Sequence, residues 1–177
     1  MDDLIGKLKA TSVSPTNSTA DNSTTTNLLS EISATKDPKL FDKHELAEVF
    51  LGLTQSSDLN ICKEAAKCIA EITKSEVQRK KFTKPDIIAA FVECLRKMPT
   101  NTANTTATGC LDLPIQICRA LGNICYLNDE ARDIILELNG DEVLLRLLDV
   151  QHIEDSENAL QFVKVFFIKI KKKLKKY

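Results

Sequence analysis

The stretch Leu113-Pro-Ile-Gln-Ile-Cys-Arg-Ala-Leu-Gly-Asn-Ile124 decides the fold of this 177-residue chain. It places apolar residues at positions i, i+4, i+7, i+8 and i+11, which share one face of an α-helix. The stretch Ile61-Cys-Lys-Glu-Ala-Ala-Lys-Cys-Ile-Ala-Glu-Ile72 fills the same five positions 52 residues earlier. Two copies of so long a pattern predict two equivalent amphipathic helices.

A shorter apolar pattern, at i, i+3, i+4 and i+7, also recurs along the chain. It begins at Leu46 and again at Ile88, 42 residues later. In a partial third copy Asp141 takes the first position, and the other three positions hold Leu144, Leu145 and Leu148. Residues 99–109 are rich in Thr and Asn and form an insert. When this insert is subtracted, both patterns recur about every 41 to 42 residues, a period typical of armadillo and HEAT repeats.

Residues that start and stop helices border these patterns. They are Asp58, Asp112, Pro85 and the pair Asn139-Gly140. The segments 75–82 and 129–138 are then expected to be the first helices of the following repeats. Because no window alternates apolar and polar residues, we predict an all-α, armadillo-type α-solenoid of about two to three repeats. A chance series of helices in an ordinary bundle is the alternative.

Composition divides the chain into three parts. Residues 1–27 contain a Ser/Thr/Asn-rich stretch that cannot bury enough apolar surface to offset its ordering entropy, so we expect this part to be mostly disordered. Residues 28–150 hold the repeats, with 99–109 as an expanded loop between helices. Residues 151–177 form a divergent, lysine-rich tail, in which apolar residues recur at helical spacing: Val163, Phe167, Ile170 and Leu174.

Such a basic amphipathic helix can lie on an anionic membrane or enter an acidic groove. The tail can equally be an extension without a role. We expect no secretory signal, because residues 1–10 carry acids and lysines and no apolar core region. We expect no membrane span, because no stretch approaches about 18 uninterrupted apolar residues.

Charge and residue content exclude several classes of function. A balance of 24 Lys+Arg against 25 Asp+Glu argues against nucleic-acid binding, which needs a basic excess. With two histidines, no P-loop and no G-x-G-x-x-G, we predict a non-catalytic protein with no catalytic residues and no cofactor. The six cysteines include no C-x-x-C pair, so we expect reduced, buried thiols in a cytosolic protein rather than metal ligands.

Three short stretches carry a resemblance to a known family. The run Arg119-Ala-Leu-Gly-Asn-Ile-Cys-Tyr126 resembles the repeat helix of the armadillo-type guanine nucleotide dissociation stimulators of small GTPases, the SmgGDS family. The run Ile69-Ala-Glu-Ile-Thr-Lys-Ser-Glu-Val-Gln-Arg79 is similar to the equivalent segment one repeat earlier, and Leu4-Ile-Gly-Lys-Leu-Lys9 resembles the family's N-terminal start. The resemblance covers roughly residues 28–150 and implies the N-terminal repeats of a longer solenoid.

This resemblance implies a regulator of small GTPases. Such a protein binds Ras- or Rho-family GTPases, including their polybasic and prenylated C-termini, and promotes GDP release without a covalent step. It also implies a cytosolic location, with association to the endoplasmic reticulum or mitochondria. The family places most of its GTPase-contacting surface on further repeats, so we expect exchange activity to be impaired in this short form.

The residues between the apolar positions are the candidate partner-binding residues. By resemblance, Arg119 and Asn123 stand where groove residues would stand, with Lys67 and Glu71 one repeat earlier. Because Asn has a low helix propensity, Asn123 either contacts a partner or satisfies a backbone group. Two other functions stay open: a generic armadillo adaptor that binds extended peptides without exchange activity, and a protein that the lysine-rich tail brings to membrane surfaces.

Overall fold

The computed structural model describes residues 2–12, 19–35, 37–98 and 112–148, and every regular element within them is a helix. In chain order they are α1 (Asp2–Ser12), α2 (Thr19–Ser33), the 3-10 helix η1 (Pro38–Phe41), α3 (Ala47–Thr54), α4 (Leu59–Ile72), α5 (Glu76–Phe82), α6 (Pro85–Arg96), α7 (Asp112–Ile124), α8 (Asp129–Glu137) and α9 (Gly140–Leu148). These residues contain no strand, so the predicted all-α class is confirmed for the described part of the chain.

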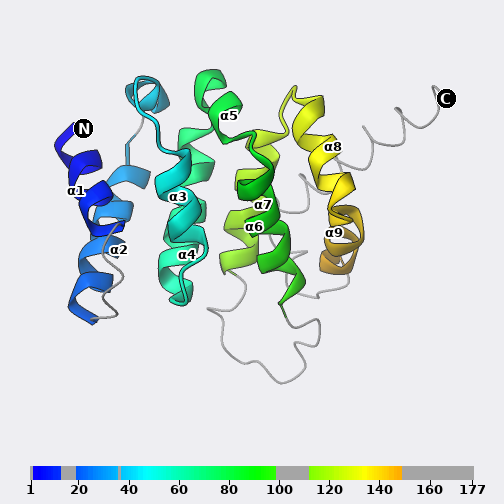
Figure 1. Ribbon diagram of the computed structural model, residues 1–177, viewed down its shortest axis with the longest axis horizontal. Coiled ribbons are helices and arrows are strands. Elements are labelled where there is room, and N and C mark those ends of the chain that lie inside the picture. The colour runs from blue at the N-terminus through cyan, green and yellow to red at the C-terminus, as the bar shows by residue number, and fades with distance from the viewer. Residues whose placement is uncertain (1, 13–18, 36, 99–111, 149–177) are drawn as a thin grey trace.

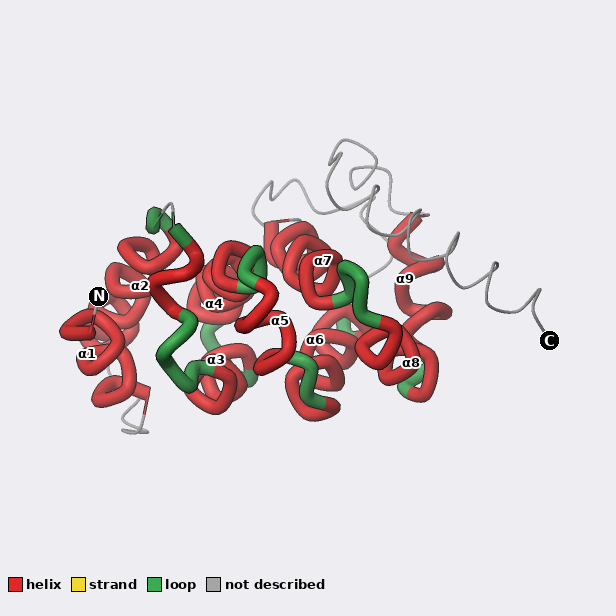
Figure 2. Tube along the Cα trace, turned by 90° about the horizontal axis from the view of Figure 1, so that it is seen from above, coloured by secondary structure: helices red, strands yellow, loops and turns green. Residues whose placement is uncertain are grey.

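The helices stack side by side in two rows, as the view from above shows (Figure 2). One row holds α2, α4 and α7, and α4 packs against both of its neighbours. The other row holds α1, α3 and α6, and α9 packs against α6. The short helices η1, α5 and α8 lie along one edge of the stack, at the top in Figure 1. This arrangement is compatible with an α-solenoid.

Both copies of the long apolar pattern face inward. All ten side chains are buried: Ile61, Ala65, Cys68, Ile69 and Ile72 in α4, and Leu113, Ile117, Ala120, Leu121 and Ile124 in α7. Burial of one Leu or Ile side chain stabilises a fold by about 1.5–3 kcal/mol. The pattern on which the sequence prediction was based is therefore also what holds the two rows together.

The boundary residues predicted from the sequence lie at helix ends in the structure. Before α4 the side chain of Asp58 accepts a hydrogen bond of 2.8 Å from the backbone N–H of Asn60. Pro85 is the first residue of α6, and Asn139 adopts a left-handed φ of 52° between α8 and α9. Asp112 is itself the first residue of α7, so its carboxylate lies in the first turn, where it complements the helix dipole.

Helices α1 and α2 occupy a region that the sequence predicted to be mostly disordered, and the structure differs from that expectation at residues 2–12 and 19–27. Five apolar side chains of the two helices are buried: Ile5, Leu8, Leu28, Leu29 and Ile32. Ser, Thr and Asn disfavour an isolated helix, but α1 packs on α2 and α3, and α2 packs on α4, and this burial of a few apolar residues supplies the missing stability. Composition alone does not reveal such packing.

The third copy of the short apolar pattern is shifted by one residue from the prediction. Val143, Leu144 and Leu147 are buried, whereas Leu145 is 48% exposed. The first inward position belongs to Gly140, where a Cβ would lie 2.6 Å from Cγ2 and 2.8 Å from the backbone oxygen of Ile135. The sequence pattern grouped Leu145 with Leu144 and Leu148, whereas the structure buries Val143 and Leu147 together with Leu144, because the inward pattern begins at Gly140 and a search for apolar residues does not recognise a glycine at its first position.

Two further predictions concern the loop 99–109 and the tail 151–177, which lie outside the described residues. Among the helices that the structure describes, none has the length and the apolar character needed to cross a lipid bilayer.

Candidate functional site

The four candidate partner-binding residues lie on α4 and α7, which are adjacent in one row of the stack. Lys67 and Arg119 follow the first residue of the long apolar pattern by six positions, and Glu71 and Asn123 follow it by ten. All four are half-buried, because they flank the inward face without belonging to it. The repeat therefore places equivalent side chains on the same side of two neighbouring helices.

Arg119 joins α7 to α4 through its guanidinium. Nη2 donates to Oε1 of Glu71 at 2.7 Å, and Nη1 donates to Oε1 of Gln116 at 2.5 Å. The side chains of Arg119 and Glu71 are only 26% and 20% exposed. A charge-assisted hydrogen bond between partly shielded groups is stronger than a fully solvated ion pair. This contact therefore fixes the spacing between α4 and α7 outside their apolar interface.

Asn123 makes a second link between the same helices. Its Nδ2 donates to the backbone carbonyl of Ala70 at 2.5 Å. Ala70 lies in the last turn of α4, where carbonyls lack intrahelical donors, and the next N–H groups go to Ile69 and Glu71 instead. Asn123 thus satisfies a backbone group, and this explains why an Asn is placed inside a helix. Contact of Asn123 with a partner stays a prediction.

The carboxylate of Glu71 is held by two cations. Besides Arg119, Lys74 in the turn after α4 binds its other oxygen. Partial burial is the largest influence on this group and opposes its ionisation, but the hydrogen bonds and charges of Lys74 and Arg119 together outweigh it and lower the pKa of Glu71. Glu71 is consequently ionised at neutral pH, and its charge is already balanced within the protein.

Lys67 stands beside this network without joining it. Its Nζ lies 3.3 Å from Oε2 of Glu64, and its side chain is 40% exposed. Lys63 pairs with the same carboxylate at 3.8 Å. The structure thus brings Arg119, Asn123 and Glu71 together and leaves Lys67 as the more accessible cation of the predicted set.

The polar face continues from α4 onto α2. Nδ2 of Asn22 donates to Oδ2 of Asp58 at 3.0 Å, while Oδ1 of Asp58 caps α4. A polar hollow of about 350 Å³ lies between the two helices and includes Thr26 and Lys63 in its lining. The hydrogen-bonded polar residues therefore cross all three helices of this row.

Three residues of this face were missed by the sequence reasoning. Gln116 and Lys74 each stand three positions from a predicted residue on the sequence, a spacing at which helical side chains meet, so this signal could have found them. Asn22 belongs to the composition-biased segment and offered no such signal.

The described cysteines are thiols in apolar surroundings. Cys68 and Cys118 are fully buried, and burial raises the pKa of Cys118 to about 12 and that of Cys68 above its usual value. Cys62 has its pKa raised to about 11, chiefly by burial, and its Sγ donates to the carbonyl of Ser56 at 3.1 Å. Such thiols stay protonated at neutral pH and are poor nucleophiles. Within the described part of the chain, no three His, Cys, Asp or Glu side chains converge on a point that could hold a metal ion.

Comparison with known proteins places this geometry in context. No family model matches the chain, and no solved structure matches it. The chain is 73% identical over 165 residues to the GTPase-GDP dissociation stimulator Vimar of Drosophila melanogaster. The match covers 93% of this chain and 24% of that protein, so the chain spans about a quarter of the length of this relative. This match confirms the resemblance to the guanine nucleotide dissociation stimulators of small GTPases. It also agrees with the prediction that the chain corresponds to only a part of such a protein.

Proposed function

We propose that this chain forms armadillo-type repeats and binds a small GTPase along the polar face of α2, α4 and α7. The observation that carries the proposal is the 73% identity to a protein named as a GTPase-GDP dissociation stimulator. In the order of the chain, a short helix such as α5 is followed by one helix from each row, here α6 and α7. This grouping supports the repeat assignment, since armadillo repeats consist of two or three helices. Ras- and Rho-family GTPases with basic, prenylated C-termini are the proposed partners.

The proposed mechanism requires no covalent chemistry. A protein accelerates GDP release when it binds the nucleotide-poor GTPase more tightly than the GDP-bound form, and by linkage GDP then weakens its binding. In this chain the Arg119–Glu71 and Asn123–Ala70 contacts hold α4 and α7 at a fixed spacing. Lys67 and Lys63 offer cations from the accessible side of α4 to acidic groups on the body of the GTPase, not to its basic C-terminus.

A charge reversal on this face tests the proposal. We expect Lys67→Glu to weaken binding to immobilised, nucleotide-free GTPases by about tenfold, which corresponds to about 1.4 kcal/mol. Lys80→Glu is the matched control, because Lys80 also pairs with a glutamate on its own helix but lies on α5, at the edge of the stack. If both variants bind as tightly as the wild type, the GTPase does not contact this face.

The same measurement separates the alternative function. A generic adaptor would bind extended peptides and show no preference between nucleotide-free and GDP-loaded GTPases. A GTPase regulator should prefer the nucleotide-free form, and this preference should be reduced by Lys67→Glu.

A further inference from the structure

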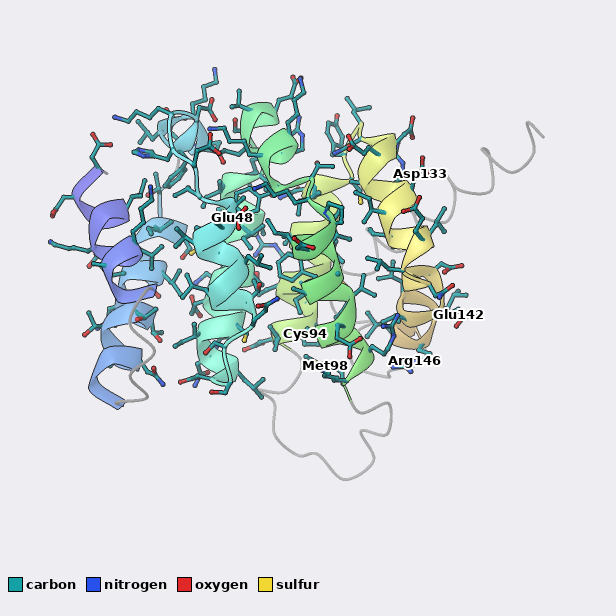
Figure 3. The ribbon with its side chains drawn as sticks, in the orientation of Figure 1. Glu48, Cys94, Met98, Asp133, Glu142 and Arg146 are labelled. Atoms are coloured by element: carbon teal, nitrogen blue, oxygen red, sulfur yellow. The ribbon has the colours of Figure 1, made fainter. Side chains whose placement is uncertain are left out.

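The last two described helices, α8 and α9, present an acidic outward side. Residues 129–148 contain six carboxylates against two guanidiniums. The guanidinium of Arg132 donates hydrogen bonds to the carboxylate of Asp129 and to the carbonyl of Cys125. Arg146 reaches back toward α6, where its Nη2 donates to the carbonyl of Arg96 at 3.1 Å. Glu142 points the opposite way, outward from the stack (Figure 3).

This side also carries apolar surface. α9 buries Val143, Leu144 and Leu147 against its neighbours α6 and α8. Leu145 points away from that buried face, is 48% exposed and lies one helical turn from Glu142. Repeats in a stack contact only their neighbours, so the outer side of the last described pair of helices has no neighbour among the described residues. A leucine that lies one helical turn from Asp141 and Glu142 fits a segment that is both basic and apolar.

The chain itself contains such a segment beyond the described residues. Residues 163–176 include seven lysines and no acidic residue, and their apolar positions follow a helical spacing. Fourteen residues separate Leu148 from Val163, and the 15 steps between these two residues span up to about 50 Å when the chain is extended. Nine residues of helix such as α9 measure only about 13 Å. The connection is therefore long enough for the segment to return to the side of α8 and α9.

We propose that the segment 163–176 docks on the outward side of α8 and α9 and covers Leu145. Its apolar stripe packs on Leu145 and on the half-buried side chains of α8, while its lysines lie against Glu137, Asp141 and Glu142. The docking is intramolecular, and it is independent of GTPase binding by the opposite row of helices.

Hydrogen–deuterium exchange on the full chain tests the docking. Peptides from α8 and α9 should exchange about tenfold more slowly in the full chain than in a chain that ends at residue 161, since tenfold corresponds to about 1.4 kcal/mol. Equal exchange in the two chains overturns the proposal. Protection that increases with protein concentration also overturns it, because a second copy would then be the partner.

Substitutions within the full chain make the test specific. Leu145→Asp should abolish the protection, whereas Leu40→Asp, at a leucine of equal 48% exposure on η1, should leave it unchanged. Combined Lys171→Glu, Lys172→Glu and Lys173→Glu should also abolish it. Adding Glu137→Lys, Asp141→Lys and Glu142→Lys to that variant should restore it, a result that misfolding cannot produce. If the lysine variant loses binding to phosphatidylserine vesicles while exchange in α8 and α9 never changes, the tail binds membranes and the proposal is wrong.

Discussion

The guanidinium of Arg119 and the carboxylate of Glu71 meet at 2.7 Å although the two residues are 48 positions apart in the sequence. They belong to equivalent helices of successive structural units, and they connect these helices outside the apolar interface. The contact shows that two of the candidate partner-binding residues also stabilise the arrangement of the two helices that carry them.

A double-mutant cycle measures the energy of this contact. Arg119→Ala should lower the free energy of unfolding by about 1 kcal/mol, because the pair is still partly solvated. The coupling energy to Glu71→Ala should be about 0.5–1 kcal/mol in urea titrations. A coupling near zero would show that the pair is not maintained in solution.

The same carboxylate gives a pH dependence with a definite sign. The folded-state pKa of Glu71 lies below its usual value of 4.5, so its stabilising effect is fully present above that value and disappears as the pH falls through the lowered pKa. The difference in unfolding free energy between the wild type and Glu71→Gln should therefore be constant from neutral pH to about pH 5 and shrink in more acidic solution. A difference that grows on acidification would contradict the assigned direction.

The inward face of α7 should be the most sensitive to truncation. Leu121→Ala and Ile124→Ala should each lower the free energy of unfolding by about 2–5 kcal/mol, because both side chains are fully buried. The control is Leu59→Ala at the exposed start of α4, with an expected change within about 0.5 kcal/mol. Chemical denaturation followed by circular dichroism compares the three variants, and equal losses would mean that the facing of α7 is wrong.

Two glycines should respond to alanine in opposite ways. Gly140→Ala forces a methyl group against the side chain and backbone of Ile135 and should destabilise the protein by about 1–3 kcal/mol. Gly52→Ala meets no atom within 4 Å inside α3 and should stabilise it by about 0.5–1 kcal/mol through helix propensity. A Gly140→Ala variant that melts at or above the temperature of the wild type would refute the tight packing of α9 on α8.

The activity of this short chain should be weak. The chain covers only 24% of the length of its Drosophila relative, so the surface available to a GTPase is correspondingly small. Fluorescent-GDP release should therefore be far slower with this chain than with the full-length relative at the same concentration. Comparable rates would mean that the stimulating surface lies within the part of the chain that is shared.

The apolar periodicity predicted the inward face of α4 and α7, because residues three or four positions apart lie on the same side of a helix and are buried together. Leu121 and Ile124 are an example. It could not predict how far one helix is displaced along its neighbour. Arg119 is the counterpart of Lys67, yet it contacts Glu71, one turn further along α4. That offset depends on how the two helices pack, and neither helix encodes it alone.

The errors of the sequence prediction have the same origin. Ile5 and Leu8 stabilise α1 only because neighbouring helices offer them a surface, so local composition underestimated residues 1–27. The phase of α9 depends on contact between Gly140 and Ile135, two residues of different helices. In each case the deciding contact is tertiary.

The polar links between units constrain how such a protein evolves. Arg119 contacts Glu71, Asn123 contacts Ala70, and Arg96 donates to the carbonyl of Leu138, in each case about one unit away along the chain. A duplication or exchange of one unit therefore inherits only half of each contact and must find the other half on an unfamiliar neighbour. Recombination should succeed most often when it moves adjacent units together, and substitutions at positions 71 and 119 should be correlated among descendants of this sequence.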